Sequence, residues 1–104
     1  MTPIYPPPVF DRQRINYVLD TTSELLDRHG WIQHASGDKE RGFCLTGALR
    51  EAHEDPDLLV AVLRRLASRT GEPFDGSWSV VAGWNDEHGR TKDEVQDLVR
   101  RARA

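Results

Sequence analysis

Apolar residues recur with a helical period through most of the chain after residue 10. In the first such segment, residues 15, 18, 19, 22, 25 and 26 share one helical face, because they occupy positions i, i+3, i+4, i+7, i+10 and i+11. Asp11 is suited to the N-cap, and His29 and Gly30 are suited to the C-terminal end. The pattern therefore predicts a helix that begins after Asp11 and ends at His29.

A second apolar stripe lies between about Phe43 and His53 and predicts a second helix, with Cys44 on its buried face. Gly47 stands in the middle of this segment, where a glycine costs about 1 kcal/mol of helix stability relative to alanine. We therefore expect another backbone or an aromatic ring to approach Gly47 closely.

Two further helices carry clear end signals. Asp55 and Pro56 are typical of an N-cap and a first helical residue, and Gly71 is typical of a C-terminal stop. Thr91 and Glu94 form a capping box, in which each side chain accepts the other residue's backbone N–H. We predict one helix between Asp55 and Gly71. We predict another after Thr91, with arginines at its C-terminal end, where the helix dipole favours cations.

The remaining segments have weaker patterns. Residues 31–43 lose the helical period and contain Ser-Gly-Asp-Lys, which predicts a turn or a short ragged hairpin. Residues 78–84 are predicted to form a short helix capped by Ser77, although Val80 and Val81 leave a strand as the alternative. The Asn, Asp and Gly between Trp84 and Thr91 are typical of a sharp connection between two helices.

These elements predict a mainly α protein, a small irregular or orthogonal bundle of four or five helices. The chain has 104 residues, which is enough for one hydrophobic core, so residues 11–104 are predicted to form a single helical domain. Four of the six prolines lie within the first ten residues, and residues 1–10 are therefore predicted to be an extended Pro-rich arm.

The charge balance argues against a nucleic-acid partner. The chain has 17 acidic and 14 basic residues and a net charge of −3 at pH 7, whereas nucleic-acid-binding domains are typically basic. No apolar run approaches the roughly 20 residues that span a bilayer, and the first residues lack the basic and apolar regions of a signal peptide. We expect a cytoplasmic protein without a membrane partner. Its single cysteine excludes an intrachain disulfide.

Cys44 is the only thiol and follows a turn at a predicted helix start, where a helix N-terminus stabilises a thiolate. A catalytic thiol needs a base, for which His34 is the best candidate, with Asp38 or Asp86 to orient it. Free cysteines are more often buried, and Cys44 shares a stripe with Leu45. We therefore expect no catalytic residue, and the Cys44 and His34 pair is the alternative.

Other chemical motifs are missing from the sequence. The four histidines have no H-E-x-x-H spacing, so we expect neither a metal nor another cofactor. The chain contains no Walker loop, no dinucleotide loop and no nucleophile elbow. The arginine pairs at 64–65 and 100–101 lie among acidic residues, which favours solvated helix faces over a phosphate site.

A small polar pocket is the other candidate site. The run from Trp84 to Thr91 is explained by a helix connection alone, but its polar residues could also face the segment around Trp31 and form a pocket with aromatic walls. The candidate binding residues are Trp31, Gln33, Trp84, Asn85, Asp86 and His88, with Trp78 as a further wall.

Three short motifs occur in an order that resembles a known family. Gly30-Trp31-x-Gln33 is followed by Gly42-x-Cys44-Leu45-x-Gly47-Ala48-Leu49, and then by Trp84-Asn85-Asp86 with Gly89-Arg90-Thr91-x-x-Glu94-Val95. From about residue 15 to residue 103 the chain resembles the DUF6197 family of small proteins from actinobacteria and their phages. The resemblance implies a compact helical fold and such a setting, without an established activity. It also implies a cysteine after the first tryptophan, where this chain has Ile32, which argues against a two-thiol or zinc site.

We therefore expect a non-enzymatic protein that binds another protein, either a host protein or a second copy of the chain, as an accessory factor that a phage could encode. The three tryptophans favour this interpretation, because tryptophan and tyrosine are common interface anchors. One alternative is a thiol-dependent hydrolase or transferase that uses Cys44 with His34. The other is a small-ligand pocket formed by Trp31, Trp78 and Trp84 with polar groups from residues 85 and 86.

Overall fold

The computed structural model describes residues 11–104. The predicted arm at residues 1–10 lies outside the described residues. The described part contains five helices and one two-stranded hairpin: α1 (Arg12–His29), β1 (Gly37–Asp38), β2 (Gly42–Phe43), α2 (Leu45–Ala52), α3 (Pro56–Thr70), α4 (Ser79–Asp86) and α5 (Lys92–Arg101). The prediction of a mainly α fold with a short ragged hairpin is confirmed.

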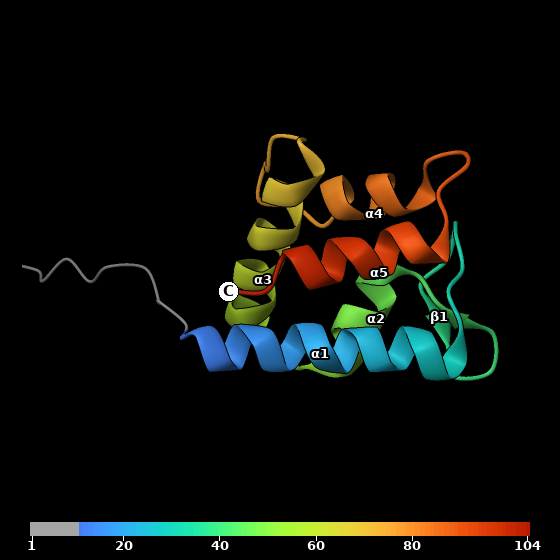
Figure 1. The fold of residues 1–104 in the computed structure, drawn as a ribbon, viewed down its shortest axis with the longest axis horizontal. Helices are drawn as coiled ribbons and strands as arrows, with labels where there is room; N and C mark the ends of the chain where they lie inside the picture. Colours follow the sequence, from blue (N-terminus) through green and yellow to red (C-terminus); the bar gives the residue numbers. More distant parts are fainter. Residues whose placement is uncertain (1–10) are drawn as a thin grey trace, which may run out of the picture.

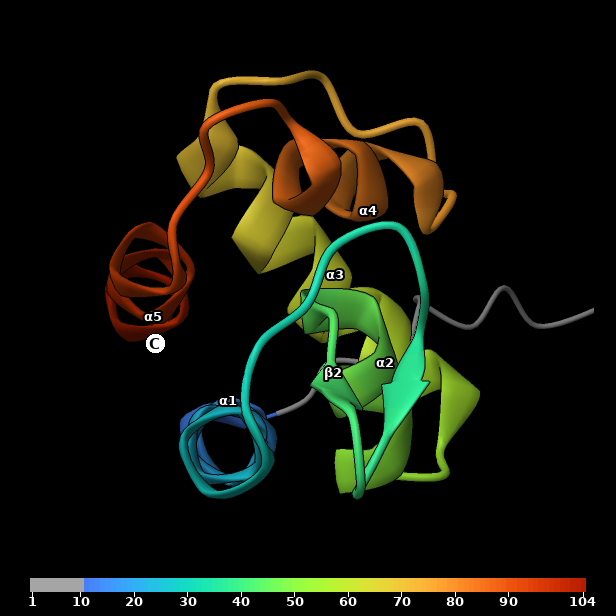
Figure 2. The ribbon, with the colours of Figure 1, turned by 90° about the vertical axis from the view of Figure 1, so that its right-hand side faces the viewer.

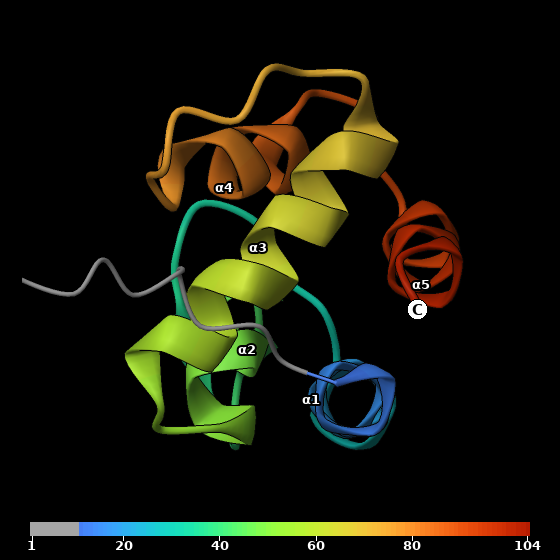
Figure 3. The ribbon, with the colours of Figure 1, turned by 90° about the vertical axis from the view of Figure 1, so that its left-hand side faces the viewer.

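The helices form an irregular bundle. Helices α1 and α5 run in opposite directions along the long axis of the molecule (Figure 1). Seen along that axis, α1 and α5 lie on one side, and α2, α3 and α4 lie on the other side with the hairpin next to α2 (Figures 2 and 3). The loop between α3 and α4 passes over the outer side of α4 in both views. This arrangement leaves α4 at the edge of the bundle.

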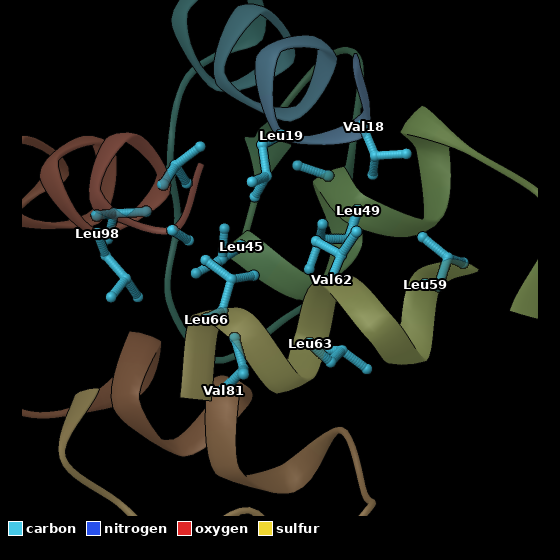
Figure 4. Close-up of a cluster of buried hydrophobic side chains, with 14 of the residues drawn as sticks. Val18, Leu19, Leu45, Leu49, Leu59, Val62, Leu63, Leu66, Val81 and Leu98 are labelled. Atoms are coloured by element: carbon cyan, nitrogen blue, oxygen red, sulfur yellow. The ribbon is translucent and has the colours of Figure 1, made fainter. Parts of the chain in front are cut away.

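The core is aliphatic and draws side chains from every helix. Leu19 of α1, Leu45 of α2, Leu66 of α3, Val81 of α4 and Leu98 of α5 are all fully buried. Figure 4 shows these side chains converging between the helices. Because burying one such side chain contributes about 1.5–3 kcal/mol, this cluster supplies the main driving force for folding.

The predicted N-terminal caps of α1, α3 and α5 are present. Asp11 Oδ1 accepts the Arg14 N–H at 2.9 Å at the start of α1. Asp55 precedes Pro56 as the N-cap of α3. At the start of α5, Thr91 Oγ1 accepts the Glu94 N–H at 3.2 Å and Glu94 Oε1 accepts the Thr91 N–H at 3.0 Å. These bonds satisfy N–H groups that have no partner inside the helix, so the ends read from the sequence are confirmed.

The hairpin packs directly on the start of α2. Residues 37 and 38 pair antiparallel with residues 43 and 42, and the Cys44 N–H donates to the Ser36 carbonyl at 3.2 Å. A Cβ atom added to Gly47 would lie 2.0 Å from the Ser36 carbonyl oxygen. The expected close approach of a backbone to Gly47 is confirmed, because only hydrogen fits between α2 and the hairpin.

Several predicted boundaries are wrong by a few residues. Helix α2 begins at Leu45, and Cys44 is its N-cap rather than part of its stripe. Helix α4 spans Ser79–Asp86 rather than 78–84, and its N-cap is Trp78, although the Ser77 hydroxyl still accepts the Ser79 N–H at 3.3 Å. Residues 85 and 86 therefore belong to the last turn of α4 and not to the connection that follows it, because tertiary hydrogen bonds described below hold them in the helix.

Arginines of α3 hold the C-terminal end of α5. Arg65 Nε donates to the Ala102 carbonyl at 2.6 Å, and its Nη2 donates to the Arg103 carbonyl at 3.0 Å. Arg69 Nε donates to the Arg101 carbonyl at 3.2 Å. These carbonyls lack partners inside α5 and carry the negative end of its dipole. The prediction of a solvated face is therefore wrong for Arg65, which is half-buried and bonded.

Candidate functional site

Asn85 is the polar centre of the molecule. Its side chain is fully buried at the C-terminal end of α4. Its Oδ1 accepts the Trp31 indole N–H at 2.6 Å and the Leu45 backbone N–H at 3.0 Å. Its Nδ2 donates to the Ile32 carbonyl at 3.2 Å and to Asp86 Oδ1 at 2.9 Å. One amide therefore joins α4, the start of α2 and the segment that follows α1.

Gln33 and Asp86 extend this arrangement, which we call the Asn85 cluster (Trp31, Gln33, His34, Asn85 and Asp86). Gln33 Nε2 donates to the Asn85 carbonyl at 3.1 Å and to the Glu87 carbonyl at 2.9 Å. Asp86 Oδ1 accepts the His34 N–H at 2.8 Å, and His34 adopts a left-handed φ of 67°. The cluster fastens residues 31–34 to the end of α4.

Four of the six predicted binding residues meet in the Asn85 cluster: Trp31, Gln33, Asn85 and Asp86. Their polar atoms bond to one another and to backbone, and no buried side-chain N or O atom of residues 11–104 lacks a hydrogen-bond partner. The amide groups that would orient a ligand are thus already used within the fold. A ligand role for these residues stays a prediction, and their observed contacts are structural.

Trp84 and His88, the other two predicted binding residues, lie outside the cluster. His88 is exposed in the connection after α4. The Trp84 ring lies under the Arg90 guanidinium, whose carbon is 3.8 Å from the ring centroid, and Arg90 Nε donates to the Trp84 carbonyl at 2.9 Å. Trp78 has a different cationic neighbour, Arg50, at 4.3 Å. The three tryptophans therefore contact three different polar or cationic side chains.

Cys44 is 6% exposed and acts as the N-cap of α2. Its Sγ accepts the Gly47 N–H at 3.3 Å and lies 3.1 Å from Thr46 Oγ1. These are its two side-chain hydrogen-bond partners within residues 11–104, so no histidine of this part is positioned to take its proton. The His34 side chain is 73% exposed and its Nδ1 lies 4.0 Å from Asp86 Oδ2. The predicted burial of Cys44 is confirmed.

The outer side of α4 carries a surface groove of about 450 Å³. Val80, Gly83, Trp84 and Glu87 are spaced as i, i+3, i+4 and i+7, so they form one stripe of the helix and its C-terminal end. Pro73, from the loop that passes over α4, lies opposite them. We call this surface the α4 groove: Glu72, Pro73, Val80, Gly83, Trp84 and Glu87. The inner side of the same helix carries the buried Val81 and Asn85.

A second groove of about 400 Å³ lies on the other side of Trp84, against α3 and α5. Its charges are largely paired with one another. The Arg101 and Arg100 side chains bond to Asp97 and lower the pKa of that carboxyl, and the Thr91 backbone N–H and hydroxyl lower the pKa of Glu94. Trp84 therefore lines two grooves, one with Pro73, Val80 and two glutamates, and the other with paired charges.

A third groove was not predicted from the sequence. Tyr17 is 63% exposed and lines a groove of about 730 Å³ with residues 51–56 at the α2 to α3 junction. Two of its three carboxylates have basic neighbours, since Glu51 lies 3.6 Å from Lys39 Nζ and Asp55 lies 3.8 Å from Arg14. The only signal in the sequence was an aromatic residue on the polar side of the first predicted helix.

Residues 11–104 lack two other features, a cluster of metal ligands and a membrane-spanning helix. No group of three or more His, Cys, Asp or Glu side chains between residues 11 and 104 could hold a metal ion. Among the same residues, no helix combines the length and apolar character needed to cross a membrane.

A family model described as "Family of unknown function (DUF6197)" matches residues 11–104, which is the whole described part of the chain. No curated protein and no solved structure matches the chain. The family match agrees with the order of the three motifs around Trp31, Cys44 and Trp84. The chain is thus a member of the DUF6197 family, whose function is unknown.

Proposed function

We propose that this chain is a non-enzymatic cytosolic protein that binds another protein through the surface around Trp84. The observation that carries the proposal is that Trp84 lines two surface grooves, with Arg90 stacked on its ring. Tryptophan and arginine are the residues most enriched among interface hot spots. A half-buried tryptophan at the edge of a bundle can anchor a partner without rearrangement of the core.

The thiol-enzyme alternative has less support. Cys44 is buried, and its sulfur is occupied as the N-cap acceptor of α2. A nucleophile needs an adjacent base and access for substrate, and His34 instead faces Asp86 on the surface. The ligand-pocket alternative likewise has less support, since the polar groups of the Asn85 cluster bond to one another.

The setting we propose is an actinobacterium or its phage, where the partner would be a host protein. The resemblance of the three motifs supports this setting. The composition is compatible with it, because twelve arginines accompany only two lysines, a bias typical of GC-rich coding sequences.

Site-specific photocrosslinking tests the proposed function. The photoreactive residue p-benzoylphenylalanine is placed at Pro73, which lines the α4 groove, and separately at Gln13, an exposed residue of α1. Both chains are expressed in the organism that encodes the protein and irradiated. We expect one discrete crosslinked protein from position 73, reduced by Trp84→Ala, and none from position 13. Equal crosslinking from the two positions, or none from position 73, would contradict the proposal.

A further inference from the structure

Gly83 is the one glycine whose presence the fold does not explain. All eight glycines of the chain lie in the described part. Six of them have a positive φ, which favours glycine, and Gly47 faces the Ser36 carbonyl. Gly83 lies inside α4, and a Cβ atom added there would meet nothing within 4 Å. The fold would therefore accept alanine at this position.

Inside a helix, glycine is more destabilising than every other residue except proline. A local rule broken without a structural reason is expected at a functional site. Gly83 is exposed and lines the α4 groove together with Val80 and Trp84, two half-buried side chains that also pack against the core. Its missing side chain leaves the helix backbone accessible to an incoming group, as in other sites where a glycine permits close approach.

The charges around the α4 groove indicate what can enter it. Pro73, Val80 and Trp84 are the apolar side chains of its lining, and Glu72 and Glu87 are exposed residues that add carboxylates to it. The Glu87 carboxylate forms an ion pair with Arg90 Nη2 at 2.7 Å. Glu72 lies in the exposed loop after α3. An apolar side chain next to a cationic one complements such a surface in shape and charge.

We propose that the α4 groove binds a peptide segment of the partner that places an apolar side chain over Gly83 and an adjacent lysine or arginine near Glu72. The inference rests on the proposed function and specifies the chemistry of the partner. The apolar side chain fills the space over the helix backbone, and the cation steers and orients the segment. The acidic edge disfavours acidic segments and nucleic acid, because like charges repel.

Selection of random peptides displayed on phage against the immobilised full chain tests this inference. An enriched peptide is labelled and its affinity is measured by fluorescence polarisation with four proteins: the unchanged chain, Gly83→Leu, Glu72→Lys and Gln13→Leu. Gly83→Leu adds an apolar side chain to the groove at a position where a Cβ atom meets nothing within 4 Å, and Gln13→Leu adds the same side chain at an exposed position of α1. The melting temperatures of the variants show that each one folds.

We expect the enriched peptides to pair an apolar residue with a lysine or arginine. We expect Gly83→Leu to weaken binding by about tenfold or more, as loss of a hot spot does. Glu72→Lys should weaken it about threefold or more, with less effect at high salt, and Gln13→Leu should have no effect. Enriched peptides that lack a basic residue, or whose affinity is unchanged by Glu72→Lys, would overturn the inference. If such peptides still lose affinity for the Gly83→Leu chain, the proposed function stands. The inference would also be overturned if Gly83→Leu lowered the affinity of none of the enriched peptides, or if the chain dimerised through this groove. In either case the crosslinking from position 73 tests the proposed function separately.

Discussion

Trp31 and Asn85 are 54 residues apart in the sequence and share a 2.6 Å hydrogen bond from the indole nitrogen to the amide oxygen. The same oxygen accepts the Leu45 N–H at the start of α2. Two segments that are distant in the chain are therefore fixed against the end of α4 by a single buried oxygen. Because α4 also carries the proposed binding surface on its other side, the bond positions that surface relative to the rest of the bundle.

Replacement of Asn85 by alanine should destabilise the fold strongly. The change leaves the Trp31 N–H, the Leu45 N–H and the Ile32 carbonyl without their partner, and a buried unsatisfied group costs about 1–3 kcal/mol. We expect the free energy of unfolding in urea to fall by about 3 kcal/mol or more. Gln13→Ala, at an exposed position, is the control. A loss below about 1 kcal/mol would show that water replaces the amide and that the cluster is not structural.

The core and the helix ends could be predicted from the sequence because they depend on local patterns. The cap at Asp55 and the capping box at Thr91 follow from side chains that reach a backbone group within three residues. Asn85 shows where such reasoning stops. Asparagine followed by aspartate is typical of a turn, and the helical state of Asn85 depends on partners at positions 31, 32 and 45. Those contacts exist only after the helices pack.

Arg65 should stabilise the chain through the end of α5. Its guanidinium donates to two carbonyls, of Ala102 and Arg103. We expect Arg65→Ala to lower the free energy of unfolding by about 1–3 kcal/mol, because hydrogen bonds from charged donors are stronger than neutral ones. Arg65→Lys should recover little of the loss, since an ammonium group cannot reproduce the two-pronged geometry. Arg28→Ala, at an exposed site on α1, serves as the control. Equal stabilities of the three variants would contradict the capping role.

The buried thiol should react slowly in the folded chain. We expect Cys44 to resist alkylation by iodoacetamide up to about pH 9 and to react at the rate of a free thiol in urea, because alkylation requires an exposed thiolate. Cys44→Ser should fold with similar stability, since serine is a good N-cap, whereas Cys44→Ala should lose about 1 kcal/mol. Rapid alkylation of the native chain at neutral pH would instead favour the thiol-enzyme alternative.

The capping box of α5 should contribute to acid sensitivity. The backbone N–H of Thr91, then its hydroxyl and Arg90, hold the pKa of Glu94 below its usual 4.5. A carboxyl whose pKa is lowered in the folded state adds stability above the unfolded pKa, and this stability is lost as the pH falls through the folded pKa. Glu94→Gln keeps an acceptor for Thr91 but removes the charge. We therefore expect the free energy of unfolding in urea to be lower for Glu94→Gln than for the unchanged chain at neutral pH. This difference should disappear at acidic pH. A loss of stability that is the same at every pH would contradict this expectation, because it would come from the shape of the side chain and not from its charge.

The candidate site was predictable only in part. Trp84 was a predicted binding residue on chemical grounds, since large aromatic residues anchor interfaces. Gly83 was not, because a glycine beside a helix end has many explanations in a sequence, and only the empty space around its backbone separates them. The sequence predicts that Asn85 lies near Trp31. That every polar atom of the Asn85 amide has a hydrogen-bond partner is seen only in the packed structure.

The most direct test of the proposed binding surface is the yield of crosslinked partner from p-benzoylphenylalanine at position 73, compared between the unchanged background and Gly83→Leu. The Gly83→Leu chain should fold with unchanged or higher stability, because a Cβ atom at this exposed position meets nothing within 4 Å and a residue that disfavours helix is removed. Our account predicts a discrete adduct in the unchanged background and its loss in the folded Gly83→Leu chain. An adduct of equal yield in both backgrounds would contradict the account, since the partner would then bind without using the space over Gly83.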